Sequence, residues 1–215
     1  MRVLMIDGHP DAGRLSQTLL ESYAAGLGTD CVITKIAVRD LEFADAKWGF
    51  ARPQSWERDL VRVAEALAAC DHLVIAFPMW WGAEPAMLKA FIDRLLMPGF
   101  AFNQHKDDPW WDGHLKGRSA DLIVTMDTPR FFLKLAYGNA IWRRWKGQVL
   151  GYCGMKPVRF FPLGPVRQGG VERNLAKWRR ALVAAAGSAA SLTRGSKTDI
   201  ADAYIHKIAS ETNRE

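Results

Sequence analysis

Short apolar runs alternate with amphipathic stretches along most of this chain, and this alternation restricts its fold more than any other feature. The runs predicted as buried strands are residues 3–6, 31–36, 72–77, 120–125 and 158–161. Between them, apolar residues recur three or four positions apart, which is the spacing of one helix face. Parallel strands joined by crossover helices give this alternation. The sequence therefore predicts an α/β fold with a doubly wound, five-stranded parallel sheet and helices on both faces.

The predicted helices cover residues 19–27, 60–70, 88–95, 131–150 and 175–182. We expect Gly28 to end the first of them, since glycine is common just after a helix. Residues 97–117 form a long connection rich in Gly, Asp and Trp. A connection of this length predicts a functional loop.

One domain and a tail account for the length of 215 residues. A hydrophobic content of 49% is enough for a substantial core. We expect one domain over residues 1–187 and a C-terminal tail over residues 188–215. A short helix around Ile200, Tyr204 and Ile208 is expected to pack on the domain or on a partner subunit.

We expect neither a membrane span nor a targeting segment. No apolar segment approaches the ~20 residues that cross a bilayer, and the first residues enter a strand pattern too quickly for a signal peptide. Cys31, Cys70 and Cys153 lie far apart and follow no metal-ligand spacing. We therefore expect free, packed thiols, no metal site and a cytoplasmic protein.

The net charge of +6 is concentrated in one segment. Between residues 130 and 180 the only acid is Glu172, and the basic residues are Arg130, Lys134, Arg143, Arg144, Lys146, Lys156, Arg159, Arg167, Arg173, Lys177, Arg179 and Arg180. This excess is typical either of solvated helix faces or of an anionic partner, such as nucleotide phosphates, anionic lipid headgroups or nucleic acid. Specific nucleic-acid binding is not expected, because the chain has no helix-turn-helix or zinc signature.

Ligands of a doubly wound sheet bind beyond the carboxyl ends of the strands, so the loops that follow the strands are the places to search. The first loop, residues 8–19, combines free amides at a helix start with the hydroxyls of Ser16 and Thr18 and with Arg14. These groups are typical of a phosphate cradle. The alternative is that Ser16 only caps the helix.

The second loop presents two indoles between a proline and a glycine, in the order Pro78, Met79, Trp80, Trp81 and Gly82. Pro78 fixes one backbone angle and Gly82 frees another, so amides can be aimed at the edge of a planar ring. The alternative is a tryptophan-rich turn of the core.

The third loop, residues 125–129, brings backbone and hydroxyl groups to a bound ring from the opposite side. A phosphate cradle at one end and a platform for a ring at the other together predict a flavin nucleotide.

Four groups of residues, taken in order along the chain, carry a resemblance to a known family. They are Gly8-His9-Pro10 with Ser16 and Thr18, the Pro78-to-Gly82 turn with Lys89 and Asp93-Arg94, Gly99-Phe100-Ala101-Phe102, and Leu150-Gly151-Tyr152-Cys153-Gly154, within residues 1–186. This pattern resembles the flavodoxin-like NAD(P)H:quinone oxidoreductases of the DT-diaphorase type and the related ancillary reductases of bacterial potassium-efflux systems. The fold implied is flavodoxin-like.

The resemblance implies a homodimer with active sites at the subunit interface, and a flavin that is FAD, with FMN as the alternative. It implies that the flavin phosphate binds His9, Ser16, Gln17, Thr18 and Leu19. It also implies that the isoalloxazine ring rests on Pro78, Met79, Trp80, Trp81 and Gly82 and meets Thr125, Met126 and Asp127.

The chain departs from this family at two points. Thr125-Met126-Asp127-Thr128 stands where the family commonly has Thr-Thr-Gly-Gly, so Asp127 is expected to accept a hydrogen bond or to cap the following helix. The tyrosine and histidine that assist hydride transfer in the family have no clear counterparts. Tyr137 is the nearest candidate for a catalytic residue.

The function expected is ping-pong hydride transfer from NAD(P)H to the flavin and then to a quinone or a similar flat acceptor. Two alternatives remain open. One is a flavodoxin-type electron carrier, although such carriers usually dock through an acidic face and this chain is basic. The other is a flavin-binding regulatory subunit of a membrane transporter, with the basic segment in peripheral contact with its partner.

Overall fold

The computed structural model describes residues 1–49, 52 and 54–212. Residues 50, 51 and 53 of the expected domain, and residues 213–215 of the expected tail, lie outside the described residues.

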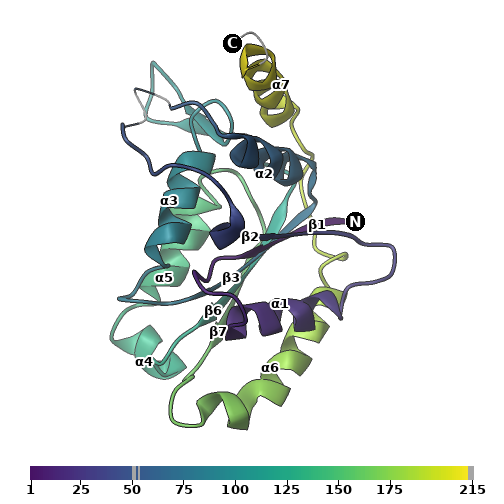
Figure 1. Ribbon diagram of the computed structural model, residues 1–215, viewed down its shortest axis with the longest axis vertical. Helices are drawn as coiled ribbons and strands as arrows, with labels where there is room; N and C mark the ends of the chain where they lie inside the picture. Colours follow the sequence, from purple (N-terminus) through teal and green to yellow (C-terminus); the bar gives the residue numbers. More distant parts are fainter. Residues whose placement is uncertain (50–51, 53, 213–215) are drawn as a thin grey trace.

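A five-stranded parallel sheet forms the centre of the molecule (Figure 1). Its strands, in spatial order, are β2 (Val32–Ala37), β1 (Arg2–Asp7), β3 (His72–Pro78), β6 (Ser119–Thr125) and β7 (Val158–Leu163). The middle strands β3 and β6 are buried at every position, whereas the edge strand β2 is partly exposed. The fold predicted from the sequence is confirmed.

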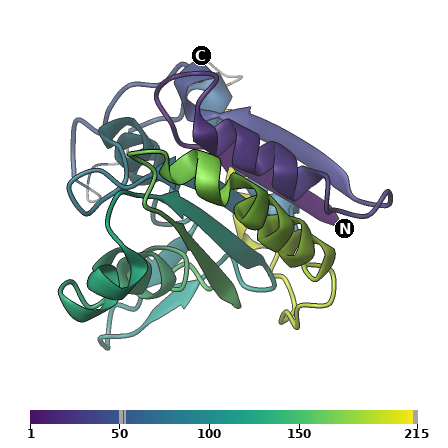
Figure 2. The ribbon, with the colours of Figure 1, turned by 90° about the horizontal axis from the view of Figure 1, so that it is seen from below.

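Helices cover both faces of the sheet. On one face, α1 (Leu15–Ala24) and α6 (Gly170–Gly187) lie side by side (Figure 2). The other face is covered by α2 (Arg58–Ala69), α3 (Ala86–Leu95), α5 (Ala140–Arg143) and the π-helical segment η2 (Arg144–Val149). Alternate side chains of a strand therefore enter different cores: Leu4 and Ile6 of β1 lie in one core, and Val3 and Met5 of the same strand lie in the other.

The register of the strands brings three loops to the same edge. Pro78, the last residue of β3, pairs with Thr125, the last residue of β6. Asp7, the last residue of β1, pairs with Ala76 of β3. Because the strands are parallel, the loops after β1, β3 and β6 leave the sheet side by side.

Two helices differ from the sequence prediction. The helix expected over residues 131–150 is divided into α4 (Arg130–Leu135), α5 and η2, because Gly138 and Asn139 take positive φ values of 55° and 52°. The first helix ends at Ala24 rather than at Gly28. Its end is set by packing, since a Cβ at Gly26 would lie 2.4 Å from the Val183 carbonyl oxygen of α6.

Two short elements complete the domain. The long connection over residues 97–117 contains a small antiparallel hairpin, β4 (Phe102–Gln104) with β5 (Trp111–Gly113). A 3₁₀ turn, η1 (Val38–Asp40), follows β2.

The tail ends in α7 (Ile200–Thr212), which packs on the domain. Ala201 and Ile205 are buried in the same core as α2 and α3. Tyr204 lies in ring contact with Trp56 and Phe100.

The cysteines are free thiols, as predicted. Burial raises the pKa of Cys70 and of Cys153 to about 12, so both pack as neutral side chains.

Candidate functional site

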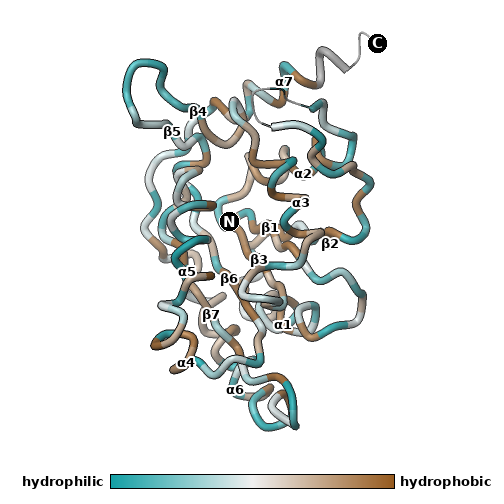
Figure 3. Tube along the Cα trace, turned by 90° about the vertical axis from the view of Figure 1, so that its left-hand side faces the viewer, coloured by the Kyte–Doolittle hydropathy of each residue, from teal (hydrophilic) through white to brown (hydrophobic). Residues whose placement is uncertain are grey.

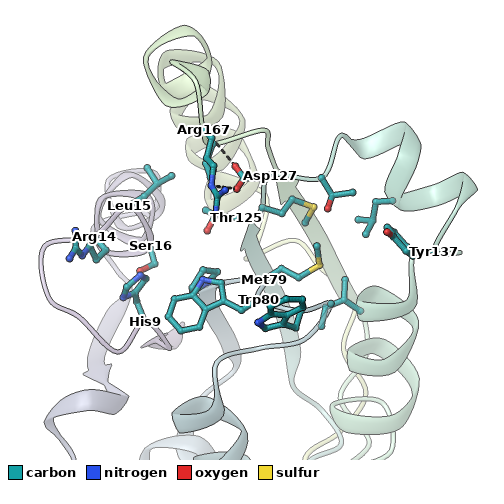
Figure 4. A pocket seen from close by; sticks show the side chains of 18 of the residues that line it. His9, Arg14, Leu15, Ser16, Met79, Trp80, Thr125, Asp127, Tyr137 and Arg167 are labelled. Carbon is teal, nitrogen blue, oxygen red and sulfur yellow. Dashed lines mark hydrogen bonds and ion pairs between the residues drawn. The ribbon is translucent and has the colours of Figure 1, made fainter.

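The three loops enclose a cavity of ≈ 950 Å³ at the carboxyl edge of the sheet (Figure 4). This volume lies within the range of small-molecule and cofactor sites, about 300–1,000 Å³. The predicted site residues that line it are His9, Ser16, Pro78, Met79, Trp80, Trp81, Gly82, Thr125, Met126, Asp127 and Tyr137.

Gln17, Thr18 and Leu19 do not line this cavity. Leu19 is fully buried between α1 and the sheet. The Gln17 side-chain oxygen accepts a hydrogen bond from the Gly13 amide at 3.1 Å, so it shapes the loop from behind.

Asp7 organises the first loop, and the sequence analysis did not single it out. This buried carboxylate accepts hydrogen bonds from the Ser16 hydroxyl (2.8 Å), the His9 amide (3.1 Å) and the Arg39 guanidinium (2.7 Å). Arg39 also donates to the His9 carbonyl at 3.2 Å. The signal available in the sequence was an acidic residue at the end of an otherwise apolar strand. A buried carboxylate needs hydrogen-bond or ion-pair partners, so Asp7 could have been singled out.

The start of α1 leaves backbone donors free. Its N-cap is Arg14, without a side-chain cap, and the Ser16 hydroxyl donates to Asp7, so the alternative of a serine cap is wrong. Within the described part of the chain, the amides of Leu15 and Ser16 have no hydrogen-bond partner. Free amides at the positive end of a helix dipole bind anions.

His9 belongs to the first loop and packs against the second. Its Nδ1 accepts a hydrogen bond from the Asp11 amide at 2.9 Å, so the proton of the neutral ring is on Nε2. Burial lowers the pKa of His9, which favours this neutral form. The ring meets the Trp80 indole edge-on, with centroids 5.7 Å apart, so His9, Ser16 and Trp80 share one edge of the sheet.

The second loop is a tight turn with a tryptophan in the left-handed region. Trp80 and Ala83 exchange two backbone hydrogen bonds of 2.9 Å, and the residues between them, Trp81 and Gly82, have φ values of 52° and 79°. Glycine adopts this conformation freely, whereas a bulky residue does so at a cost. Among the described residues, the amides of Trp81 and Gly82 have no partner, and the Trp81 indole is fully exposed.

Glu84 supports this turn from behind, and it too was missed by the sequence analysis. Its buried carboxylate accepts hydrogen bonds from Arg144, in a bidentate pair, and from the Trp145 indole at 3.2 Å. The pair fixes η2 against the tryptophan turn. The signal in the sequence was the position of Glu84 directly after the tryptophan turn.

The third loop is joined to its neighbours by backbone bonds. The Met79 amide donates to the Thr125 carbonyl at 2.8 Å, and the Met126 amide donates to the Leu163 carbonyl at 3.0 Å. These bonds fix the separation of the loops, and with it the width of the cavity.

Asp127 accepts hydrogen bonds from a fourth loop, which follows β7. Its carboxylate accepts from the Arg167 amide at 2.9 Å and pairs with Arg167 Nε at 2.6 Å (Figure 4). Of the two roles expected for Asp127, hydrogen bonding is confirmed, and capping is wrong because Pro129 is the N-cap of α4 and has no side-chain cap. Arg167 was missed, although the strand-end rule that located the other loops also applies to the loop after β7.

Tyr137 lies on the wall opposite His9 and Ser16 (Figure 4). It belongs to the turn between α4 and α5, and its ring packs edge-on against Phe132 with centroids 5.5 Å apart. The turn that breaks the expected long helix therefore supplies this wall.

The donor set fits a flat ring with an anionic tail. The free amides of Leu15 and Ser16 stand at one end, and indole, thioether and backbone groups form the other walls. The described residues contain no group of three or more His, Cys, Asp or Glu side chains that could hold a metal ion. Within the same residues, none of the helices has the length and apolar character needed to cross a membrane.

Residues 1–186 match a family model described as the flavodoxin-like fold. A protein from Ruegeria pomeroyi named FMN-dependent NADH:quinone oxidoreductase is 29% identical over 131 residues, which are 59% of this chain and 63% of that protein. Human ribosyldihydronicotinamide dehydrogenase [quinone] is 32% identical over 111 residues, 49% of this chain and 46% of that protein. The chain thus spans less than two thirds of either relative.

Solved structures show the same fold. Smu.1420 from Streptococcus mutans UA159 superposes with a TM-score of 0.68 at 26% identity, over 86% of this chain and all of that one. A structure described as a putative quinone reductase from Klebsiella pneumoniae gives a TM-score of 0.72 at 23% identity, over 90% of this chain and 86% of that one. With its sheet order, its carboxyl-edge cavity and the match over residues 1–186, the chain belongs to the flavodoxin-like fold family.

Proposed function

We propose that this protein is a flavin-dependent NAD(P)H:quinone oxidoreductase. The observation that supports it most is the convergence of three loops on one cavity, with unpartnered amides at one end and exposed indoles at the other. The relatives named as quinone oxidoreductases support the same reaction.

We propose FMN as the flavin, in place of the FAD expected from the sequence. The relatives from Ruegeria pomeroyi and Cereibacter sphaeroides are named FMN-dependent. The same names give NADH as the donor, so NADH is the first donor to test and NADPH the second.

The residues of the cavity have distinct tasks in this proposal. The amides of Leu15 and Ser16 bind the phosphate, with the Nε2–H of His9 as a further donor. Trp80, Trp81 and Met79 contact the ring on one side, and the loop of Thr125 and Met126 contacts it on the other. Because these groups are fixed by Asp7, Glu84 and backbone bonds, they are organised before the ligand binds.

Bound FMN would supply the hydride chemistry, since a flavin accepts a hydride from a nicotinamide and passes it to a quinone. The protein orients two flat molecules face to face and keeps water from the contact. The hydride donor NAD(P)H and the quinone acceptor would use the same cavity one after the other, which gives ping-pong kinetics. Arg167 at the rim would offset negative charge that develops on the ring.

Several further expectations become proposals. We propose a homodimer, as the resemblance implies, and a cytoplasmic location. Contact with a membrane transporter stays a prediction. An electron carrier with an acidic docking face is disfavoured by the net charge of +6.

The test begins with the colour of the purified protein. We expect FMN to be bound or taken up on reconstitution, to be identified after release by chromatography, and to be bleached by NADH without oxygen and re-oxidised by a soluble quinone. Trp80→Ala should weaken FMN binding about tenfold or more, by analogy with base–aromatic stacking. Trp48→Ala, an exposed indole outside the cavity, should not. A protein that takes up no flavin would overturn the proposal.

A further inference from the structure

The short helix α4 presents an unusually apolar surface beside the mouth of the cavity. Phe131, Phe132 and Leu135 are 66%, 44% and 80% exposed. Figure 3 shows α4 as a largely hydrophobic segment at the outside of the molecule. Large exposed apolar side chains that gather in one place mark a surface for a partner or a membrane.

Positive charge surrounds these side chains. Arg130 and Lys134 of α4, Arg143 of α5 and Lys146 of η2 are all exposed. Within the described residues, none of these four makes an ion pair, whereas Arg144 and Arg167 are paired with Glu84 and Asp127. No acidic residue occurs between Asp127 and Glu172, so this charge is not compensated locally.

We propose that this surface, which we call the α4 face (Phe131, Phe132 and Leu135 with Arg130, Lys134, Arg143 and Lys146), docks on an anionic lipid surface. Aromatic and aliphatic side chains enter the headgroup boundary while lysine and arginine remain among the phosphates. A two-fold contact centred on the α4 face would bring the same cations together, so the proposed homodimer would meet through another surface.

Docking there would place the cavity mouth at the lipid. Leu133, on the inner side of α4, lines the cavity, as do Tyr137 of the following turn and Ile141 of α5. This step rests on the proposed function: the acceptor taken from the membrane would be a quinone with an apolar tail, dissolved in the bilayer.

The direct test is co-sedimentation of the FMN-loaded protein with vesicles. We expect binding to vesicles of phosphatidylglycerol mixed with phosphatidylcholine, weaker binding as salt is added, and little binding to phosphatidylcholine alone. Equal binding to both vesicles, or binding to neither, would overturn the proposal.

Variants identify the face. Arg130→Gln/Lys134→Gln should weaken binding to anionic vesicles about tenfold, and Phe131→Ser/Leu135→Ser should weaken it by at least as much. The matched control is Arg179→Gln/Arg180→Gln on α6, where two exposed cations are removed from another part of the basic segment. A control that loses as much affinity as the α4 variant would attribute the binding to net charge and overturn the proposal.

Two further readouts separate this proposal from its alternatives. Turnover with a short-chain, soluble quinone should be unchanged in the α4 variants, because the substituted residues do not line the cavity, while turnover with a vesicle-embedded quinone should fall. If the α4 variants lose vesicle binding but the wild type turns over no quinone, the result would support docking and reject the proposed function. Vesicle binding that persists in the Phe131→Ser/Leu135→Ser variant while a dimer dissociates would show an interface between copies and overturn the proposal.

Discussion

Two aspartates on and just after β6 make the same ion pair in opposite environments. Asp121 pairs with Arg159 at the amino end, and Asp127 pairs with Arg167 at the carboxyl end, each with an N···O distance of 2.6 Å. The Asp121 side chain is 0% exposed and that of Asp127 is 41% exposed. Because the distance is the same, the surroundings decide what each pair does.

The amino end is closed and its polar groups are satisfied. Asp121 also accepts a hydrogen bond from the Tyr23 hydroxyl at 2.6 Å, and His72 bridges Tyr23 and Ser119 through contacts of 2.9 and 2.8 Å. Histidine, aspartate and serine are the residue types of a hydrolytic triad, yet these three have no exposed surface. Substrate has no access to this network, so its role is structural.

The carboxyl end is open and keeps donors without partners. Within the described residues, the amides of Leu15, Ser16, Trp81 and Gly82 have no acceptor. Unpartnered donors in a cavity are the groups that a ligand can satisfy. The comparison therefore shows that access and missing partners, rather than reactive residue types, mark the functional end of this sheet.

The largest effect is expected from Asp121→Ala. The change leaves the half-buried Arg159 and the buried Tyr23 and His72 without the carboxylate that they share, and removal of one partner from a buried ion pair costs about 3–5 kcal/mol. Urea denaturation monitored by circular dichroism measures the loss. FMN affinity of the folded fraction should stay at the wild-type value, because the network lies at the end of the sheet opposite the cavity.

A loss below about 1 kcal/mol would mean that the buried network contributes no more than a surface pair, and the contrast between the two ends would fail.

The second prediction concerns the stability of the fold at acidic pH. Burial alone would raise the pKa of Asp121, but hydrogen bonds from His72, Arg159 and Tyr23 outweigh it, and the pKa lies below its ordinary value. The unfolded chain then binds the proton more readily, so this stabilisation is present above about pH 4 and is lost as pH falls through the folded-state pKa. Urea midpoints between neutral pH and about pH 3 should decline more gently for Asp121→Asn than for the wild type. Parallel declines would contradict the assignment.

At the open end, Trp81→Gly should separate stability from binding. The left-handed conformation costs a non-glycine residue about 1–2 kcal/mol, and glycine loses about 0.5–1 kcal/mol of chain entropy in compensation, so the free energy of unfolding should change by less than about 1 kcal/mol. FMN affinity should fall about tenfold, because one wall of the cavity is removed. Fluorescence titration of FMN measures it.

Trp81→Asn is the control for the backbone, since asparagine tolerates the same conformation. It should lose FMN as Trp81→Gly does. Retained affinity in the asparagine variant would show that the turn, and not the indole, holds the flavin.

The sequence was sufficient for the five strands of the sheet and for the loops that converge, because both follow from local periodicity and from one rule about strand ends. His9 and Trp80 are 71 positions apart, yet the rule brought their loops together, and their rings are in contact. Residues that depend on long-range pairing were missed. Asp7 meets Arg39, and Asp127 meets Arg167, only because β2 and β7 lie where they do.

The break between α4 and α5 was missed for a different reason. Apolar spacing continues through residues 131–150, and Gly138 alone is a weak signal against a helix. The positive φ of Asn139 and the packing of Leu133 and Ile141 beside the cavity decide the break, and neither is visible as a local pattern.

The smallest effect is expected from Asp127→Ala, the counterpart of Asp121→Ala. The Arg167 side chain is 84% exposed, and ion pairs in water contribute about 0–1 kcal/mol, so the free energy of unfolding should fall by less than about 1 kcal/mol. Salt screens exposed charges, so the difference from the wild type should shrink at high salt, whereas the cost of Asp121→Ala should persist there. The released Arg167 remains at the cavity rim as a free cation and should strengthen FMN binding slightly. Equal losses for the two variants at high salt would show that burial does not distinguish these pairs, and the functional contrast between the ends of the sheet would then rest on the unpartnered amides alone.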